Sequence, residues 1–160
     1  MRNLLTFSLF LFAAALFASP TIYRDTAGRR AGTATVTGKV TTYRDGAGRR
    51  TGTSIQSGNR TIYRDASGRV VGTAVQNGNN TIYRDRSGHL VGRATINDNR
   101  TIYRDGSGKV TGRSTQTGSR TTYRDGSGRL AGWVSDSSDP NIDRDGFYRV
   151  QPQKNGTGSR

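Results

Sequence analysis

The sequence contains no cysteine, and it has only one histidine, one tryptophan and one methionine among its 160 residues. The absence of cysteine excludes disulfides and thiolate nucleophiles. The one histidine, His89, stands at a repeated position where other copies carry Arg or Lys, so we interpret it as a basic member of a repeat rather than a catalytic base. We therefore predict that the protein is not an enzyme and uses no cofactor.

Apolar residues are also scarce in this chain. Hydrophobic residues make up 31% of it and aromatic residues 8%, whereas glycine occurs 22 times. A thick, dry core between two layers cannot be built from this composition. The composition leaves either a disordered chain or a thin, repetitive β structure, and the fixed spacing of Tyr and Gly described below favours the β structure.

The charge of the chain is one-sided. The formal net charge is +14, almost all cations are Arg, and every acidic residue is Asp, because glutamate is absent. Short Asp side chains suit turns, whereas Glu and Lys suit helices. A net charge of this size promotes solubility and attraction to polyanions.

The first 18 residues form a separate segment. Arg2 precedes an apolar run from Leu4 to Phe17, which has the length of a signal-peptide core and is short for a membrane span. We predict a signal peptide over 1–18 that is cleaved after Ala18, with an uncleaved membrane anchor as the alternative. The protein is then exported to the periplasm, the cell surface or the medium.

The rest of the chain is dominated by a stretch that recurs every twenty residues. The copy from Thr61 to Gly72 reads TIYRDASGRVVG. Near-copies begin at Thr21, Thr41, Thr81, Thr101 and Thr121, and a worn copy begins at Asn141. A fixed period of this size indicates a repeat architecture. We predict a β-repeat domain over 19–150, followed by a disordered tail over 151–160.

Each repeat is predicted to form two strands joined by a tight turn. The segments TIYRD and RVVGTAV are rich in β-branched and aromatic residues, as strands are. Asp65 and Gly68, the first and fourth residues of the turn, are typical of a type I turn closed by a glycine in the left-handed region. This turn is expected to pair Asp65 with Arg69 and Tyr63 with Val71.

A second turn is predicted at Gly78, ten residues after Gly68. In one copy Asp98 takes the place of this glycine, and Asp tolerates positive φ better than most residues. We expect the turn to pair Val75 with Asn79, so that the register accumulates no shift along the chain.

This register predicts regular rows of side chains across the sheet. One row alternates Asp with a cation, which places opposite charges face to face. On the same face a second row alternates Tyr with a smaller residue, and on the other face Ile alternates with Gly. The charge row runs Asp25, Arg29, Asp45, Arg49, Asp65, Arg69, Asp85, His89, Asp105, Lys109, Asp125, Arg129, Asp145 and Arg149.

We therefore predict an all-β fold of tandem 20-residue β-hairpin repeats in an antiparallel meander that is twisted or curled. The alternative, a parallel β-solenoid, would stack Asp on Asp and Arg on Arg. The sequence leaves open whether the sheet closes into a barrel or has one face covered by a partner. The polar segment 135–140, with Phe147 and Tyr148 beyond it, is expected to protect the last edge, since exposed edges allow self-association.

The motif YRDxxGR, beginning at Tyr63 and followed by a Gly about ten residues later, resembles the YD repeats of bacterial secreted and cell-surface proteins. The resemblance covers about residues 21–132, and its Gly-Arg-hydrophobic step matches at Gly68 and Gly128. It implies a hairpin-built sheet in an exported protein, in a family linked to large surface or toxin-enclosing shells and to carbohydrate contact. The family usually has an aromatic residue directly before the Asp, where this chain has Arg64.

Metal and nucleotide sites find little support in the sequence. The repeat supplies one Asp per copy, each expected opposite a cation, whereas a calcium site needs several converging oxygens. The Gly-Ser-Gly segments at 106–108 and 126–128 lack the helix and the lysine of a phosphate-binding loop. We expect no metal ion and no small-molecule substrate.

The one functional candidate is a row of arginines on the Ile face. The Arg of each Tyr-Arg-Asp step has no acidic partner in the predicted register, so the row would form a cationic stripe. Such a stripe would bind a nucleic acid, an acidic polysaccharide, a lipopolysaccharide or another anionic cell-surface component. The alternative is that these arginines form a solvated basic face that binds no ligand. The predicted polyanion-binding residues are Arg24, Arg30, Arg44, Arg50, Arg64, Arg84, Arg104 and Arg124.

From these observations we expect a structural or surface-interaction module, with polyanion binding as the alternative. The export prediction is checked by fractionating cells that produce a tagged version of the protein. We expect a processed product outside the cytoplasm, because the apolar run fits a secretory signal. A product that stays in the cytoplasm with residues 1–18 attached would contradict the prediction.

Overall fold

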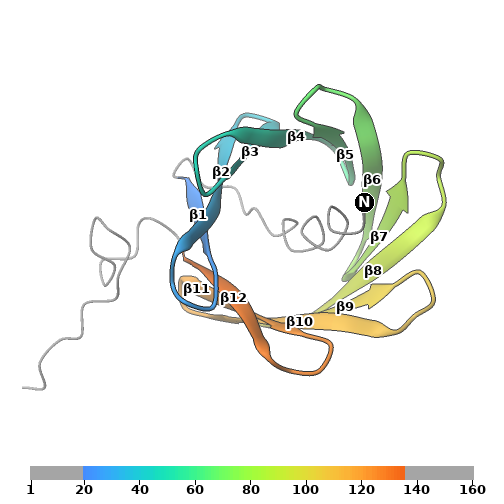
Figure 1. Cartoon of the computed structure of the whole chain (residues 1–160). Coiled ribbons are helices and arrows are strands. Elements are labelled where there is room, and N and C mark those ends of the chain that lie inside the picture. The colour runs from blue at the N-terminus through green and yellow to red at the C-terminus, as the bar shows by residue number, and fades with distance from the viewer. Residues whose placement is uncertain (1–19, 136–160) are drawn as a thin grey trace, which may run out of the picture.

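The computed structural model describes residues 20–135, so the predicted leader, the worn repeat from Asn141, Phe147, Tyr148 and the tail lie outside the described residues. Within residues 20–135 the chain forms strands joined by short turns (Figure 1), and no helix there is long and apolar enough to cross a membrane. The twelve described strands are β1 (Thr21–Arg24), β2 (Arg30–Thr37), β3 (Val40–Asp45), β4 (Arg50–Ser57), β5 (Arg60–Asp65), β6 (Val70–Asn77), β7 (Asn80–Asp85), β8 (Leu90–Asn97), β9 (Arg100–Asp105), β10 (Val110–Thr117), β11 (Arg120–Asp125) and β12 (Leu130–Ser135).

The strands form one antiparallel meander that closes into a barrel (Figure 1). Each strand pairs with the next one along the chain, and β12 pairs with β1. The predicted meander is therefore confirmed. The parallel solenoid is wrong, because every strand pair is antiparallel.

The seam of the barrel keeps the register of the other hairpin junctions. Trp133 of β12 lies opposite Arg24 of β1, just as Thr33 of β2 lies opposite Arg44 of β3. The Trp133 ring also has two guanidinium groups over it, that of Arg24 at 5.3 Å and that of Arg120 at 4.3 Å from the ring centroid. Closure leaves no free edge among the described strands, so β12 needs no protection by the segment that follows it.

The first turn of each repeat is built as predicted. The Gly68 N–H donates to the Asp65 carbonyl at 3.0 Å, and the Asp65 N–H donates to the Arg69 carbonyl at 2.9 Å. Gly68 has a φ of +86°, which a glycine adopts without a steric penalty. The predicted Asp65–Arg69 pairing across the turn is confirmed.

The second turn is shorter than predicted. Gly78, with a φ of +55°, is the first of only two loop residues between β6 and β7, a pattern typical of type II′ hairpin turns. Asp98 takes the same conformation with a φ of +51°, as its position predicted. The predicted Val75–Asn79 pair is wrong, because Val75 lies opposite Ile82.

A β-bulge in each hairpin corrects the rest of the predicted register. In β5–β6, Arg64 lies opposite Val70 and Tyr63 lies opposite Gly72, so Val71 is an extra residue. The other five described hairpins have the same irregularity. The predicted Tyr63–Val71 pair is wrong, because one extra residue shifts the pairing of everything beyond it.

The bulge also removes two of the predicted rows. Gly72 joins the face that carries Tyr, and Ile62 lies opposite Thr73 instead of alternating with glycine. Asp85 lies opposite Gly72 in β6–β7, so the predicted charge row does not continue across the sheet. Pairing between Asp and a cation is confined to single turns.

Gly72 lies where the backbone of the next hairpin comes close to it. A Cβ atom on Gly72 would be 2.5 Å from the backbone oxygen of Arg84 in the next hairpin, and Gly32, Gly52 and Gly92 make the equivalent approach. A side chain at these positions would force the neighbouring backbones apart. Gly72 was predicted to lie on the Ile face, but it lies on the Tyr face and allows close packing there.

The core of the barrel consists of tyrosines and small residues. Tyr83 lies opposite Ala74 on one side and Gly92 on the other, and the Tyr43 and Ser54 hydroxyl oxygens are 3.0 Å apart. The diameter of a barrel grows with the number of strands, and side chains just fill a barrel of eight strands. A barrel of twelve strands is wider and has room for large tyrosine rings. The buried hydrophobic residues are Ala34, Tyr43, Ala74, Tyr83, Ala94, Tyr103, Tyr123 and Val134.

The interior changes the ionisation of the tyrosines. Burial raises the pKa of Tyr23, and the negative charge that Tyr43 and Tyr103 carry when they ionise raises it further. The pKa is raised, chiefly by burial, in each of the other interior tyrosines, namely Tyr43, Tyr63, Tyr83, Tyr103 and Tyr123. The interior therefore favours neutral phenols.

Replacing Gly72 with alanine is expected to destabilise the protein by about 1–3 kcal/mol, because the new methyl group overlaps the Arg84 carbonyl. Denaturant unfolding followed by circular dichroism measures the loss. Val71→Ala, at the exposed neighbouring residue, is the control and should change stability little. A Gly72→Ala protein as stable as the control would contradict the close approach.

Stability is expected to fall as the pH rises above the ordinary tyrosine pKa of 10.0. The folded-state pKa is raised, so the unfolded chain loses its phenolic protons first, and stability that is complete below pH 10.0 is lost above it. Tyrosinate absorbance and the circular dichroism of the sheet should change over the same pH range. Ordinary titration of these tyrosines in an intact sheet would contradict their burial.

Candidate polyanion-binding surface

The arginine of each Tyr-Arg-Asp step holds the turn of its own hairpin. Nη1 of Arg64 donates to the carbonyl oxygen of Gly68 at 2.9 Å. The same bond, at 2.8–3.0 Å, joins Arg24, Arg44, Arg84, Arg104 and Arg124 to the glycine four residues later. Arg64 was predicted to have no acidic partner, and the partner that the structure gives it is a backbone carbonyl. A guanidinium has five N–H donors, so this bond engages only part of the group.

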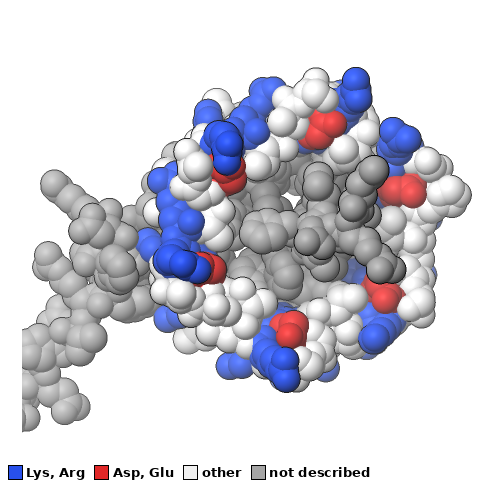
Figure 2. All heavy atoms as spheres, viewed as in Figure 1, with Lys and Arg blue, Asp and Glu red and all other residues white. Residues whose placement is uncertain are grey.

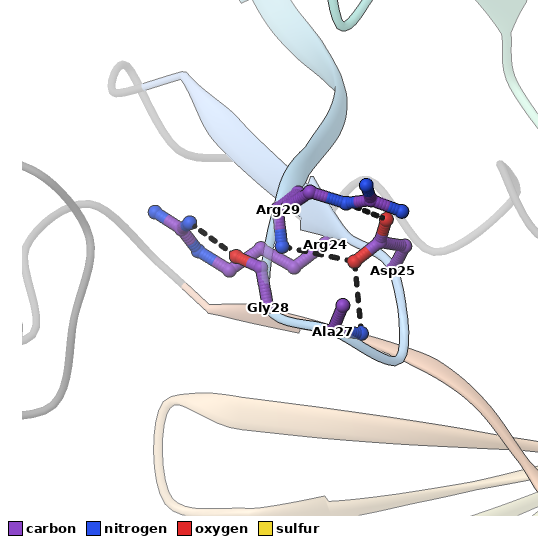
Figure 3. A network of polar contacts seen from close by, with 5 residues as sticks. All are labelled: Arg24, Asp25, Ala27, Gly28 and Arg29. Atoms are coloured by element: carbon purple, nitrogen blue, oxygen red, sulfur yellow. Dashed lines mark hydrogen bonds and ion pairs between the residues drawn. The ribbon is translucent and has the colours of Figure 1, made fainter.

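The Asp side chains stabilise the turns in which they lie. Figure 3 shows the first repeat, where Arg24 donates to the Gly28 carbonyl while the Asp25 carboxylate accepts three hydrogen bonds. These come from the backbone N–H groups of Ala27 and Arg29, both at 2.9 Å, and from Nε of Arg29 at 3.0 Å. The carboxylate thus turns toward its own loop and does not neutralise Arg24.

The same arrangement keeps Asp65 ionised. The Ser67 hydroxyl donates to its carboxylate at 2.6 Å, and the Arg69 N–H donates at 2.9 Å. These bonds, with the Ser67 N–H and the Arg69 charge, hold the pKa of Asp65 below its usual range even though desolvation opposes them. The sequence placed Asp65 in a turn, and the structure adds the particular N–H and hydroxyl donors that its carboxylate accepts from.

Some of the predicted ion pairs do form inside these turns. Arg29 Nε lies 3.0 Å from Asp25 Oδ2, and Arg49 Nε lies 3.2 Å from Asp45 Oδ2. His89 Nδ1 lies 3.4 Å from Asp85 Oδ2, in the position that the repeat predicted. Among residues 20–135 no group of three or more His, Cys, Asp or Glu side chains could hold a metal ion.

The predicted binding residues differ in accessibility. Arg24 is only 7% exposed, so its assignment to an open stripe is wrong. Arg64 is half-buried, and Nη2 of Arg50 donates to the carbonyl of Ala66 in the next turn at 2.6 Å. The exposed members are Arg30, Arg44, Arg50, Arg84, Arg104 and Arg124.

The observed strand pairing adds two arginines to the basic surface that were not predicted from the sequence. Arg93 of β8 lies directly opposite Arg104 of β9, and Arg113 of β10 lies directly opposite Arg124 of β11. Within residues 20–135 the Arg93 and Arg113 side chains have no hydrogen-bond or ion-pair partner. The only signal in the sequence was their position, because three earlier repeats carry Thr33, Thr53 and Thr73 there.

The exterior of the barrel is consequently basic. Figure 2 looks at one end of the barrel, where Lys and Arg project outward around the rim and Asp lies on the inner side next to them. Cations therefore meet the solvent first, while the Asp of each described Tyr-Arg-Asp step is engaged by its own turn. An extended anion that follows the outside of the barrel would contact guanidinium groups before carboxylates.

These features define a class: a closed antiparallel β-barrel of repeated hairpins with a tyrosine interior and an arginine exterior. Its fold is similar to that of a protein from Arabidopsis thaliana whose X-ray structure matches with a TM-score of 0.52 and 10% sequence identity. The match covers 74% of this chain and 80% of that chain, and at this identity the likeness concerns the fold alone. No protein-family model and no curated protein sequence matches this chain.

Proposed function

We propose that the protein is a non-enzymatic, exported surface-interaction barrel that binds an anionic polymer through its exterior arginines. The observation that carries this proposal is the set of outward arginines whose partners are backbone carbonyls or other arginines rather than acids. An arginine fork matches sulfate, phosphate and carboxylate groups. The net charge of +14 adds a long-range attraction for the same class of ligand.

The bond to the turn glycine supports binding by holding each guanidinium in place. Nη1 of Arg84 is fixed 2.8 Å from the Gly88 carbonyl, and Nη1 of Arg104 is fixed 3.0 Å from the Gly108 carbonyl. A side chain that is already ordered loses less conformational entropy when a ligand arrives. The repeat thereby presents ordered cations at regular intervals around the barrel.

The expected compartment supports a polymer of the cell envelope as the ligand. The signal-like segment 1–18 and the resemblance to YD repeats both point to an exported protein. Anionic polymers of that environment include acidic polysaccharides and lipopolysaccharides. A barrel that bound none of them would instead serve as a structural module.

The proposal is tested by measuring heparin affinity as a function of salt. The logarithm of the affinity should fall linearly with the logarithm of salt concentration between about 50 and 200 mM, because counterions are released on binding. Replacing Arg44, Arg84 and Arg104 together with Gln should flatten this slope by about 0.7–0.9 for each arginine that no longer neutralises an anionic group.

The control replaces Arg29 and Arg49 with Gln, and the change in slope is compared per arginine replaced. Both side chains already pair with an Asp of their own turn, so their loss should change the slope less. Circular dichroism confirms that each variant is folded. No binding to heparin, or an affinity that does not respond to salt, would contradict the proposed function.

A further inference from the structure

Two neighbouring sectors of the exterior carry the same row of side chains across four strands. Each row begins with Ile, continues with two arginines directly opposite each other, and ends with an aliphatic residue. The first row is Ile82, Arg93, Arg104 and Val110, and the second is Ile102, Arg113, Arg124 and Leu130. The rows lie on β7–β10 and β9–β12, one repeat apart.

The barrel itself does not require these arginine pairs. Like charges directly opposite each other in an antiparallel sheet are destabilising. At the position of Arg93 and Arg113 the other described repeats carry Thr33, Thr53, Thr73 and Trp133, in the same fold and register. Neither Arg93 nor Arg113 has a partner among the described residues that would offset the repulsion. An anionic ligand would supply that partner.

We propose that the exterior of β7–β11 is the binding site for an acidic polysaccharide, with Arg93, Arg104, Arg113 and Arg124 as the residues that contact its anionic groups. This inference rests on the proposed function and assigns it a sector and a ligand class. Directly opposed residues of an antiparallel pair have Cα atoms about 4.5–5.5 Å apart. Two arginine side chains that leave the sheet at this Cα separation can both reach one oxyanion group, which offsets their mutual repulsion.

The surroundings of the arginines favour a polysaccharide over a single-stranded nucleic acid. Proteins that bind single strands without base readout stack the bases on aromatic side chains. The tyrosines of these strands, Tyr83, Tyr103 and Tyr123, are at most 5% exposed in the interior. The outward residues between the arginines are aliphatic or hydroxyl-bearing, such as Ile102 and Thr115. Strands β7–β11 thus offer charge and hydrogen bonding but no exposed aromatic ring, and the outward Trp133 of the neighbouring β12 already has the guanidinium groups of Arg24 and Arg120 over its ring.

The test compares two double variants of the full chain that lose the same charge. Arg93→Thr with Arg113→Thr restores the residue found in the earlier repeats. Arg69→Thr with Arg129→Thr, at exposed turn positions outside the rows, is the control. Binding of heparin, polygalacturonate and oligo(dT) is measured at one salt concentration, and thermal unfolding is measured for each protein.

We expect the Arg93/Arg113 variant to bind the polysaccharide that wild type prefers roughly tenfold more weakly, since charge-assisted hydrogen bonds are removed. Its thermal stability should equal or exceed that of wild type, because two like-charge pairs are gone. The control should bind nearly as tightly as wild type. The heparin and polygalacturonate arms distinguish sulfate from carboxylate as the anionic group.

Four results would overturn the inference. An equal loss of binding in the control would show that the charge acts diffusely, which leaves the proposed function intact. Tighter wild-type binding to oligo(dT) than to either polysaccharide would make a nucleic acid the ligand. A loss of stability in the Arg93/Arg113 variant, with unchanged binding, would give the arginines a structural role. Wild-type protein that binds none of the three polymers would refute the proposed function as well.

Discussion

The extra residue in each hairpin is the constraint on which the rest of the structure depends. In β5–β6 it is Val71, and it brings Gly72 onto the face that carries Tyr63. There the next hairpin approaches until the Arg84 carbonyl is 2.5 Å from where a Cβ atom would be. Bulges also increase the local twist and bend of a strand, which a sheet needs in order to close. The bulge therefore sets the register, allows the close packing at Gly72 and supports the closure of the barrel.

Closure of the barrel gives the sheet an inner and an outer face, and the residues of each repeat are divided between them. The tyrosines point inward, where burial raises their pKa and keeps them neutral. The arginines point outward, each tied to the glycine carbonyl of its turn. The aspartates lie between these layers and bond to backbone N–H groups of the turn. A motif of three consecutive residues thus supplies core, exterior and turn in each copy that the structure describes.

Much of the fold could be read from the sequence because it depends on local chemistry. Asp65 and Gly68 predict the first turn, and Asp98 in place of a glycine predicts a positive φ, since both follow from single-residue conformational preferences. The antiparallel arrangement was predicted because a solenoid would stack like charges, and it is observed although the alternating charge row predicted with it does not form. The predicted arginine row lies on the outer face, although Arg24 is buried beside Trp133.

The sequence by itself determined the period, the strands and the first turn of each repeat. Only the tertiary structure decided the bulge at Val71, the two-residue loop at Gly78 and the pairing of β12 with β1. These features depend on contacts between strands that no single repeat contains, because a bulge exists only relative to its partner strand. The same holds for Arg93 and Arg113, which face Arg104 and Arg124 only in the observed register.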